Sequence, residues 1–170
     1  MTNFNEHALE MAVMELFENE GYIYTNGEDI HKELSEVLLI DDLRAYLFNR
    51  YAEQEISSLE IERIISKLKS DVSGSLYENN AHTYRLITEG FAIHREDSSK
   101  ADLFIEPIDF NDSKNNIFRI VNQLEIKGKE KRIPDAVVYV NGLPLVVFEF
   151  KSAVKENTTI KDAFIQLTVR

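Results

Sequence analysis

Two acidic residues and a lysine lie at a spacing suited to phosphodiester chemistry. Asp135 follows Pro134, Glu149 comes fourteen positions later, and Lys151 follows after two more. Two carboxylates can hold a divalent cation such as Mg²⁺, which neutralises a phosphate and generates hydroxide near neutral pH. A neighbouring lysine can orient the attacking water and offset the growing negative charge. The three residues therefore predict a divalent-metal phosphodiesterase site.

The acid and the lysine of the second motif lie in an apolar run, Val147 to Lys151, that reads as a β-strand. Side chains alternate along a strand, so Glu149 and Lys151 share one face, about 6.7 Å apart along the chain direction. Phe148 and Phe150 point the other way, toward a core. An ordinary half-buried strand shows the same alternation, and in that interpretation Glu149 and Lys151 form a structural ion pair.

A hairpin signal, Asn141-Gly142, separates the two acids and sets a test of the site. A two-residue turn places Asp135 opposite Phe148 and therefore on the face opposite Glu149. A slip of one residue reverses the face of every side chain. The metal site therefore requires a three-residue loop with a positive φ at its glycine, or a compensating bulge, expected near Pro134.

The stretch from Asn116 to Lys151, NIFRIVNQLEIKGKEKRIPDAVVYVNGLPLVVFEFK, resembles the amino-terminal nuclease domain of the restriction (R) subunit of type I restriction-modification enzymes. That domain belongs to the PD-(D/E)xK nuclease superfamily. Weaker likeness extends across the chain, including LEMAVMELFENEGY near its start. The resemblance implies that Asp135 and Glu149 bind Mg²⁺ and that Lys151 is the catalytic lysine. The backbone carbonyl of Phe150 is a further candidate ligand.

Two other positions match the family only in part. Glu10 matches an acidic position that the superfamily often carries ahead of its core strands, so it is a candidate metal ligand. It also lies beside the apolar stripe of a predicted helix, where a solvated flank is the alternative. Gln166 matches the glutamine of the family's Gln-x-x-x-Tyr motif and is a candidate DNA contact, but Arg170 stands where the motif has tyrosine.

The charge of the chain is unevenly distributed. The net charge is −11, which is unusual for a DNA-binding enzyme. Residues 113–170, however, carry ten Lys and Arg against six Asp and Glu, whereas residues 1–112 carry nine against twenty-four. Basic residues gather just before Asp135, either as DNA-contact candidates or as a solvated turn: Lys127, Lys129, Lys131 and Arg132.

Length and composition predict one globular domain over residues 1–170, and the resemblance implies that it is a nuclease domain. Residues 1–112 form its acidic, largely helical front half and residues 113–170 its catalytic core. Apolar residues make up 44% of the chain, and no apolar run is long enough to span a membrane. The absence of cysteine excludes disulfides and thiolate zinc sites, and a cytoplasmic location is expected.

Hydrophobic periodicity predicts an α/β fold with an additional helical part, and the order of its elements resembles a PD-(D/E)xK restriction-endonuclease-like core. The core is a helix, an antiparallel three-strand meander and a second helix, and it is truncated at its carboxyl end. Helices are predicted at 6–19, 31–37, 41–54, 57–69 and from 159, a loop at 71–82, a strand-like run at 101–109, and meander strands at 117–126, 133–140 and 144–151.

The function predicted from these features is Mg²⁺-dependent hydrolysis of DNA within a type I restriction-modification complex. By resemblance, the partners are DNA, the methyltransferase and specificity subunits, and a translocase region further along the same subunit, with no membrane partner. ATP is expected only in the full-length subunit, because the chain has no Gly-x-x-x-x-Gly-Lys-Ser/Thr loop. The alternatives are a repair or recombination nuclease of the same superfamily and a non-catalytic docking module.

Overall fold

The structure, a computed structural model, describes residues 6–70, 74–128 and 130–151. The chain divides into two compact units. Unit 1 combines Met1–Leu39 with Phe118–Arg170, and unit 2 comprises Ile40–Ile117. The unit boundaries therefore differ from the change in charge at residue 112, because the first segment of the chain packs with the strands that carry the motif residues.

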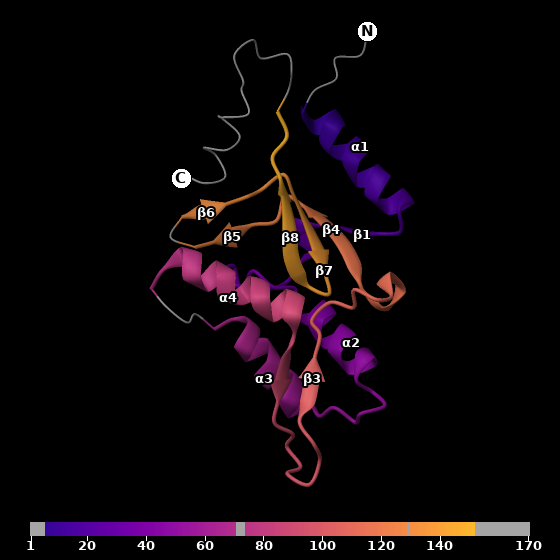
Figure 1. Ribbon diagram of the computed structural model, residues 1–170. Coiled ribbons are helices and arrows are strands. Elements are labelled where there is room, and N and C mark those ends of the chain that lie inside the picture. The colour runs from indigo at the N-terminus through magenta and orange to yellow at the C-terminus, as the bar shows by residue number, and fades with distance from the viewer. Residues whose placement is uncertain (1–5, 71–73, 129, 152–170) are drawn as a thin grey trace. The chain divides into compact units, whose positions relative to one another are not determined.

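A four-stranded sheet forms the centre of unit 1 (Figure 1). Its order is β1 (Ile23–Asn26), β4 (Phe118–Asn122), β7 (Ala136–Val140) and β8 (Leu143–Phe148). The pairs β4–β7 and β7–β8 are antiparallel, so the predicted three-strand meander is confirmed. Strand β1 adds a parallel neighbour to β4, which makes the sheet mixed.

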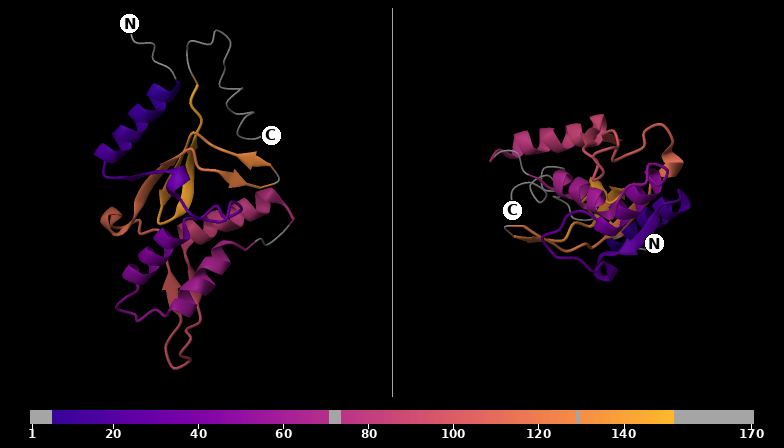
Figure 2. Two further views of the ribbon diagram at one scale, coloured as in Figure 1. Left: turned by 180° about the vertical axis from the view of Figure 1, so that it is seen from behind. Right: turned by 90° about the horizontal axis from the view of Figure 1, so that it is seen from below.

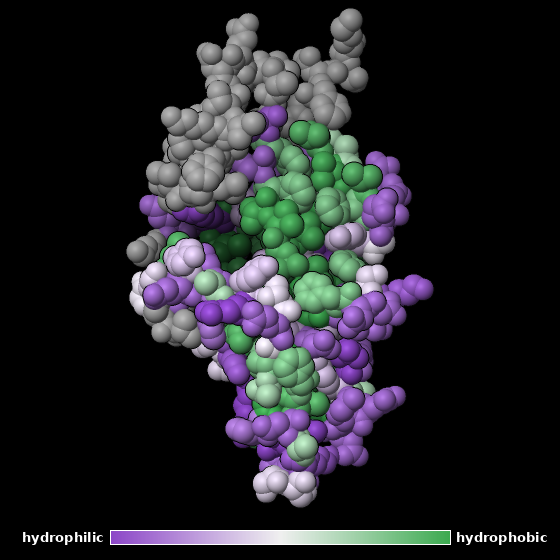
Figure 3. Space-filling model, viewed as in Figure 1, coloured by the Kyte–Doolittle hydropathy of each residue, from purple (hydrophilic) through white to green (hydrophobic). Residues whose placement is uncertain are grey.

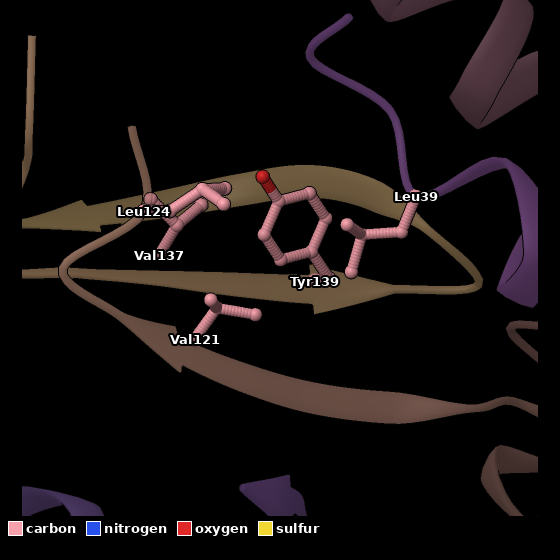
Figure 4. Close-up of a cluster of buried hydrophobic side chains, with 5 residues drawn as sticks. All are labelled: Leu39, Val121, Leu124, Val137 and Tyr139. Atoms are coloured by element: carbon pink, nitrogen blue, oxygen red, sulfur yellow. The ribbon is translucent and has the colours of Figure 1, made fainter. Parts of the chain in front are cut away.

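Both faces of this sheet are covered by apolar side chains. On one face, helix α1 (Glu6–Asn19), which confirms the helix predicted at 6–19, contributes Met14 to a buried cluster with Ile120, Ala136 and Val138. Phe148 and Phe150 pack against this cluster, as predicted. Figure 2 shows α1 beside the sheet from behind. On the other face, a second cluster contains the residues drawn in Figure 4: Leu39, Val121, Leu124, Val137 and Tyr139.

The helix predicted at 31–37 is wrong. Residues 31–39 form turns and bends that lie along the second cluster. The carbonyl of Leu34 accepts a hydrogen bond from the amide of Lys127 at 2.8 Å, and the carbonyl of Val37 accepts one from the Tyr139 hydroxyl at 3.2 Å. Leu39 donates its amide to the carbonyl of Gly142 at 2.9 Å. Because partners elsewhere in unit 1 take these backbone groups, the segment does not form its own helical bonds.

The meander strands are shorter than predicted. Strand β4 ends at Asn122 because Gln123 adopts a positive φ of 52°, which leaves the extended region. Between β4 and β7 the chain forms a separate small hairpin of β5 (Ile126–Lys127) and β6 (Lys131–Arg132). Strand β8 is an edge strand with exposed Leu145, Val146 and Val147, and Figure 3 shows apolar surface in this region.

Unit 2 is built from three helices and a small antiparallel sheet. These are α2 (Ile40–Arg50), α3 (Ser58–Leu68), α4 (Leu76–Glu89), β2 (Phe91–Ile93) and β3 (Leu103–Ile105). The helices predicted at 41–54 and 57–69 are thus confirmed with shorter bounds. A capping box explains the start of α3, because Ser57 and Glu60 exchange side chain to backbone hydrogen bonds.

The predicted loop at 71–82 is wrong from residue 76 onward. The Ser, Gly and Asn content of this stretch suggested a loop, but Ser75 caps helix α4 by accepting a hydrogen bond from the amide of Glu78 at 3.4 Å. The three-residue spacing of Ser75 and Glu78 is a sequence signal for a helix start. In the described ranges, no helix is both long and apolar enough to cross a membrane.

Candidate functional site

The β7–β8 hairpin satisfies the register requirement by an unexpected route. The predicted three-residue loop is wrong, since Val140 pairs with Leu143 across a two-residue turn whose residues have φ values of 52° and 78°. The register then shifts, because Tyr139 pairs with Pro144 while Val138 pairs with Val146. The extra residue of this bulge is Leu145, on the strand opposite the predicted position near Pro134.

The bulge restores the alignment of the two acids. Beyond it, Val137 pairs with Val147 and Ala136 with Phe148. Continuing this register by one residue places Asp135 opposite Glu149. Pairs directly opposite each other in an antiparallel ladder share a face of the sheet. The hairpin therefore provides the alignment that the sequence analysis required of a metal site.

Hydrogen bonds hold these side chains at the end of the sheet where β7 begins and β8 ends. The amide of Phe150 donates to Oδ2 of Asp135 at 2.6 Å. Lys151 Nζ donates to Oε1 of Glu149 at 2.7 Å, with the lysine side chain 25% exposed and the glutamate side chain 6% exposed. The structure thus brings Asp135, Glu149 and Lys151 together, and it contains the ion pair expected under the structural interpretation.

The surroundings of Asp135 raise the pKa of its carboxyl above the ordinary aspartate value. Burial is the largest cause, and the negative charges of Glu149 and Glu10 raise the pKa further. The hydrogen bond from the Phe150 amide and the positive charge of Lys151 act in the opposite direction. The negative charges of Glu149 and Glu10 therefore act on Asp135 in the folded chain.

Glu10 is buried, so the expectation of a solvated flank is wrong. Only 7% of the residue is exposed. Its Oε1 accepts hydrogen bonds from Asn122 Nδ2 at 2.8 Å and from Gln123 Nε2 at 3.1 Å. Its Oε2 lies 3.8 Å from Nδ1 of the exposed His7. Helix α1 therefore carries a buried carboxylate whose charge reaches Asp135.

The sequence analysis missed Asn122 and Gln123. Asn122 is 4% exposed and follows the apolar run of β4, on the face that Ile120 shares with α1. A buried polar residue at a core-facing strand position needs a hydrogen-bond partner, and this was the available signal. The amide of Gln123 also donates to the carbonyl of Asp135 at 3.2 Å. The end of β4 thus contacts both Glu10 and Asp135.

The candidate DNA contacts are only partly described. Lys127, Lys131 and Arg132 lie on the exposed β5–β6 hairpin, where Lys131 pairs with Glu125 at 2.7 Å. Lys129, Gln166 and Arg170 lie outside the described residues, as does the helix predicted from residue 159. The role of this hairpin in binding DNA stays a prediction.

The donor atoms at this site fit a hard divalent cation. Carboxylate and carbonyl oxygens are the ligands that Mg²⁺ prefers, and Mg²⁺ commonly keeps several waters and uses only one or two protein carboxylates. Across 6–70, 74–128 and 130–151, no three His, Cys, Asp or Glu side chains lie close enough together to hold a metal ion. Glu10 therefore does not complete a three-carboxylate ligand set with Asp135 and Glu149 in this structure.

The mixed sheet and four described helices make this an α/β fold compatible with a nuclease-like domain. The family described as type I restriction enzyme R protein N terminus matches residues 3–170. The chain belongs to this family.

Curated relatives are named as type I restriction enzyme endonuclease subunits. The chain is 32% identical over 174 residues to the type I restriction enzyme HindI endonuclease subunit of Haemophilus influenzae, covering 95% of this chain and 16% of that protein. It is 26% identical over 164 residues to the type I restriction enzyme SauCOLORF180P endonuclease subunit of Staphylococcus aureus, covering 96% of this chain and 16% of the relative. The chain thus spans about a sixth of the length of these relatives.

Proposed function

We propose that this chain is a Mg²⁺-dependent endonuclease domain with a PD-(D/E)xK core, which hydrolyses DNA phosphodiester bonds in the cytoplasm within a type I restriction-modification complex. The observation that carries the proposal is the bulged hairpin, which aligns Asp135 with Glu149 and leaves Lys151 beside them. Membership of the R protein family supports the same conclusion.

Each residue of the proposed site has a distinct role. Asp135 and Glu149 hold the ion, with the Phe150 carbonyl as a further ligand. When bound, Mg²⁺ supplies charge neutralisation at the phosphate and a lowered pKa of water. Lys151, whose Nζ contacts Oε1 of Glu149 at 2.7 Å, would orient the attacking water and offset negative charge. Glu10 adds negative potential near Asp135.

DNA and the other subunits of the complex are the proposed partners. The exposed β5–β6 hairpin offers Lys127, Lys131 and Arg132 to the phosphate backbone. Such contacts position the duplex without reading its sequence. Sequence recognition and translocation are assigned to the specificity subunit and to the translocase region, and methylation to the methyltransferase subunit.

The second candidate function is that of a non-catalytic docking module of a larger DNA-processing complex. The Glu149–Lys151 contact at 2.7 Å favours it, because an ion pair of this kind satisfies both side chains without a metal. In this case the strand end serves only to stabilise the fold. The two candidates differ in one measurable property, the affinity of the site for a divalent cation.

Titration of the chain with Mn²⁺, followed calorimetrically, tests the proposal. The wild-type chain is expected to bind, and Asp135→Ala is expected to lose binding. The matched control is Asp41→Ala, which removes a side chain that is 97% exposed in unit 2 and should leave binding unchanged. Equal titration curves for the wild type and Asp135→Ala would favour the docking module. Lys151→Met should keep metal binding and abolish DNA cleavage by the assembled complex.

A further inference from the structure

The amide side chains at the end of β4 form a small network around the carboxylate of Glu10. Oε1 of Glu10 accepts two hydrogen bonds, from Asn122 at 2.8 Å and Gln123 at 3.1 Å. The Oδ1 atom of Asn122 in turn accepts a hydrogen bond from the Tyr24 hydroxyl at 3.2 Å. Asn122 therefore uses both ends of its amide, and its orientation is fixed from two sides.

The donors in this network are neutral. The oxygens of a buried carboxylate need hydrogen-bond donors, and a lysine or arginine would supply them together with a positive charge. The amide donors of Asn122 and Gln123 satisfy Oε1 without adding a positive charge beside Glu10. Oε2 of Glu10 lies 3.8 Å from Nδ1 of His7, whose side chain is 77% exposed.

Gln123 also connects Glu10 to the acid of the proposed site. The side chain of Gln123 contacts Glu10, while its backbone amide donates to the carbonyl of Asp135 at 3.2 Å. Gln123 has a positive φ of 52°, a conformation that is strained for a residue other than glycine. Surrounding contacts must compensate for this strain, as is common at functional sites.

We infer that Asn122 is a positioning residue that, together with Gln123, holds the carboxylate of Glu10 in its buried position and so strengthens divalent-cation binding at the site. Neither amide touches the ion, and both act through Glu10. This inference rests on the proposed metal-dependent function. Removal of groups that hold charged or ligating side chains at metal sites typically costs about 10–100-fold in metal affinity.

The test is the affinity of the chain for Mn²⁺, measured from the electron paramagnetic resonance signal of the free ion. Asn122→Ala is expected to bind about ten-fold more weakly than the wild type. Gln123→Ala is expected to show a smaller loss in the same direction, and its exposed position makes unfolding of this variant a lesser concern. Asn116→Ala is the matched control, because it removes an amide bonded to Asp109 in unit 2.

A double-mutant cycle separates positioning from a general loss of structure. In a Glu10→Gln background, Asn122→Ala should cause no further loss of affinity, because the group through which it acts has gone. A ten-fold loss that persists in this background would overturn the inference. Wild-type affinity in folded Asn122→Ala and Gln123→Ala would overturn it also, while the metal site would stand. If the wild-type chain itself bound no Mn²⁺, both the proposed site and the inference would fail.

Discussion

Deleting one residue from β8 should keep Asp135 opposite Glu149, whereas inserting one residue should disturb this alignment. Deleting Leu145 removes the extra residue of the bulge, and Val138 can still pair with Val146 in a regular ladder. Every pairing beyond that point is kept, so Asp135 stays opposite Glu149. Inserting an alanine after Leu145 instead requires a larger bulge or a slip of the strand by one residue.

The cost of the slip follows from the side chains that it moves. Glu149 would shift by about 3.3 Å along the strand and turn to the other face of the sheet. Phe148 and Phe150, which pack against the cluster under α1, would turn toward the face that the acids occupy. Full burial of a phenylalanine contributes about 1.5–3 kcal/mol, so exposing two partly buried rings should cost about 2–3 kcal/mol in the free energy of unfolding.

Mn²⁺ affinity and chemical denaturation measure the two effects. The deletion should bind Mn²⁺ like the wild type and lose less stability than the insertion. The insertion should bind at least about 100-fold more weakly, since a ligand is lost. An alanine inserted between Ser98 and Ser99, in an exposed loop of unit 2, controls for insertion itself. The reasoning is refuted if the deletion loses binding as completely as the insertion, or if the insertion keeps it.

Two further substitutions test the surroundings of the site. The pKa of Asp135 is raised in the folded state. Between a pH of about 3.9 and this raised pKa, the folded chain keeps a proton that the unfolded chain has lost, so the free energy of unfolding falls as pH rises through this range. Asp135→Asn should therefore raise the melting temperature at pH 7 and leave it unchanged near pH 3; a lower melting temperature at pH 7 would contradict this. Gly27→Ala places a Cβ 2.5 Å from Cα of Leu124 and 2.6 Å from the carbonyl oxygen of Gln123, which should destabilise the fold by about 1–3 kcal/mol in urea unfolding. Gly74→Ala, with nothing within 4 Å, should be close to neutral, and equal effects of the two would refute the packing argument.

The sequence predicted the strands of the core because their periodicity is local. The turn signal Asn141-Gly142 depends on neighbouring residues and was confirmed. Phe148 and Phe150 pack toward the core as expected, but β8 ends at Phe148, before Glu149. The position of the bulge was not predictable in this way. It depends on which side chains of β7 and β8 must share a face of the sheet. The sequence analysis inferred that a bulge could be needed but expected it near Pro134, not at Leu145.

Other errors came from tertiary contacts that local patterns do not encode. The segment 31–37 has residues compatible with a helix, yet its carbonyls bond to Lys127 and Tyr139, which lie far along the chain. Glu10 sits at a helical flank, and the hydrogen bonds that compensate for its burial come from the distant Asn122 and Gln123. Strand β1 pairs in parallel with β4 across more than ninety residues, beyond the range of any periodicity.

That long separation has a consequence for how the chain is made. Unit 2 lies in the sequence between Leu39 and Phe118, so β1 emerges from the ribosome long before its partner β4. Unit 2 has its own helices and sheet and can fold during that interval, while β1 remains without its partner strand β4. Pairings between distant segments form slowly and leave strand edges exposed to aggregation. Assembly of the sheet, and with it the hydrogen bonds between Glu10 and the end of β4, is thus expected to be the late step of folding during synthesis.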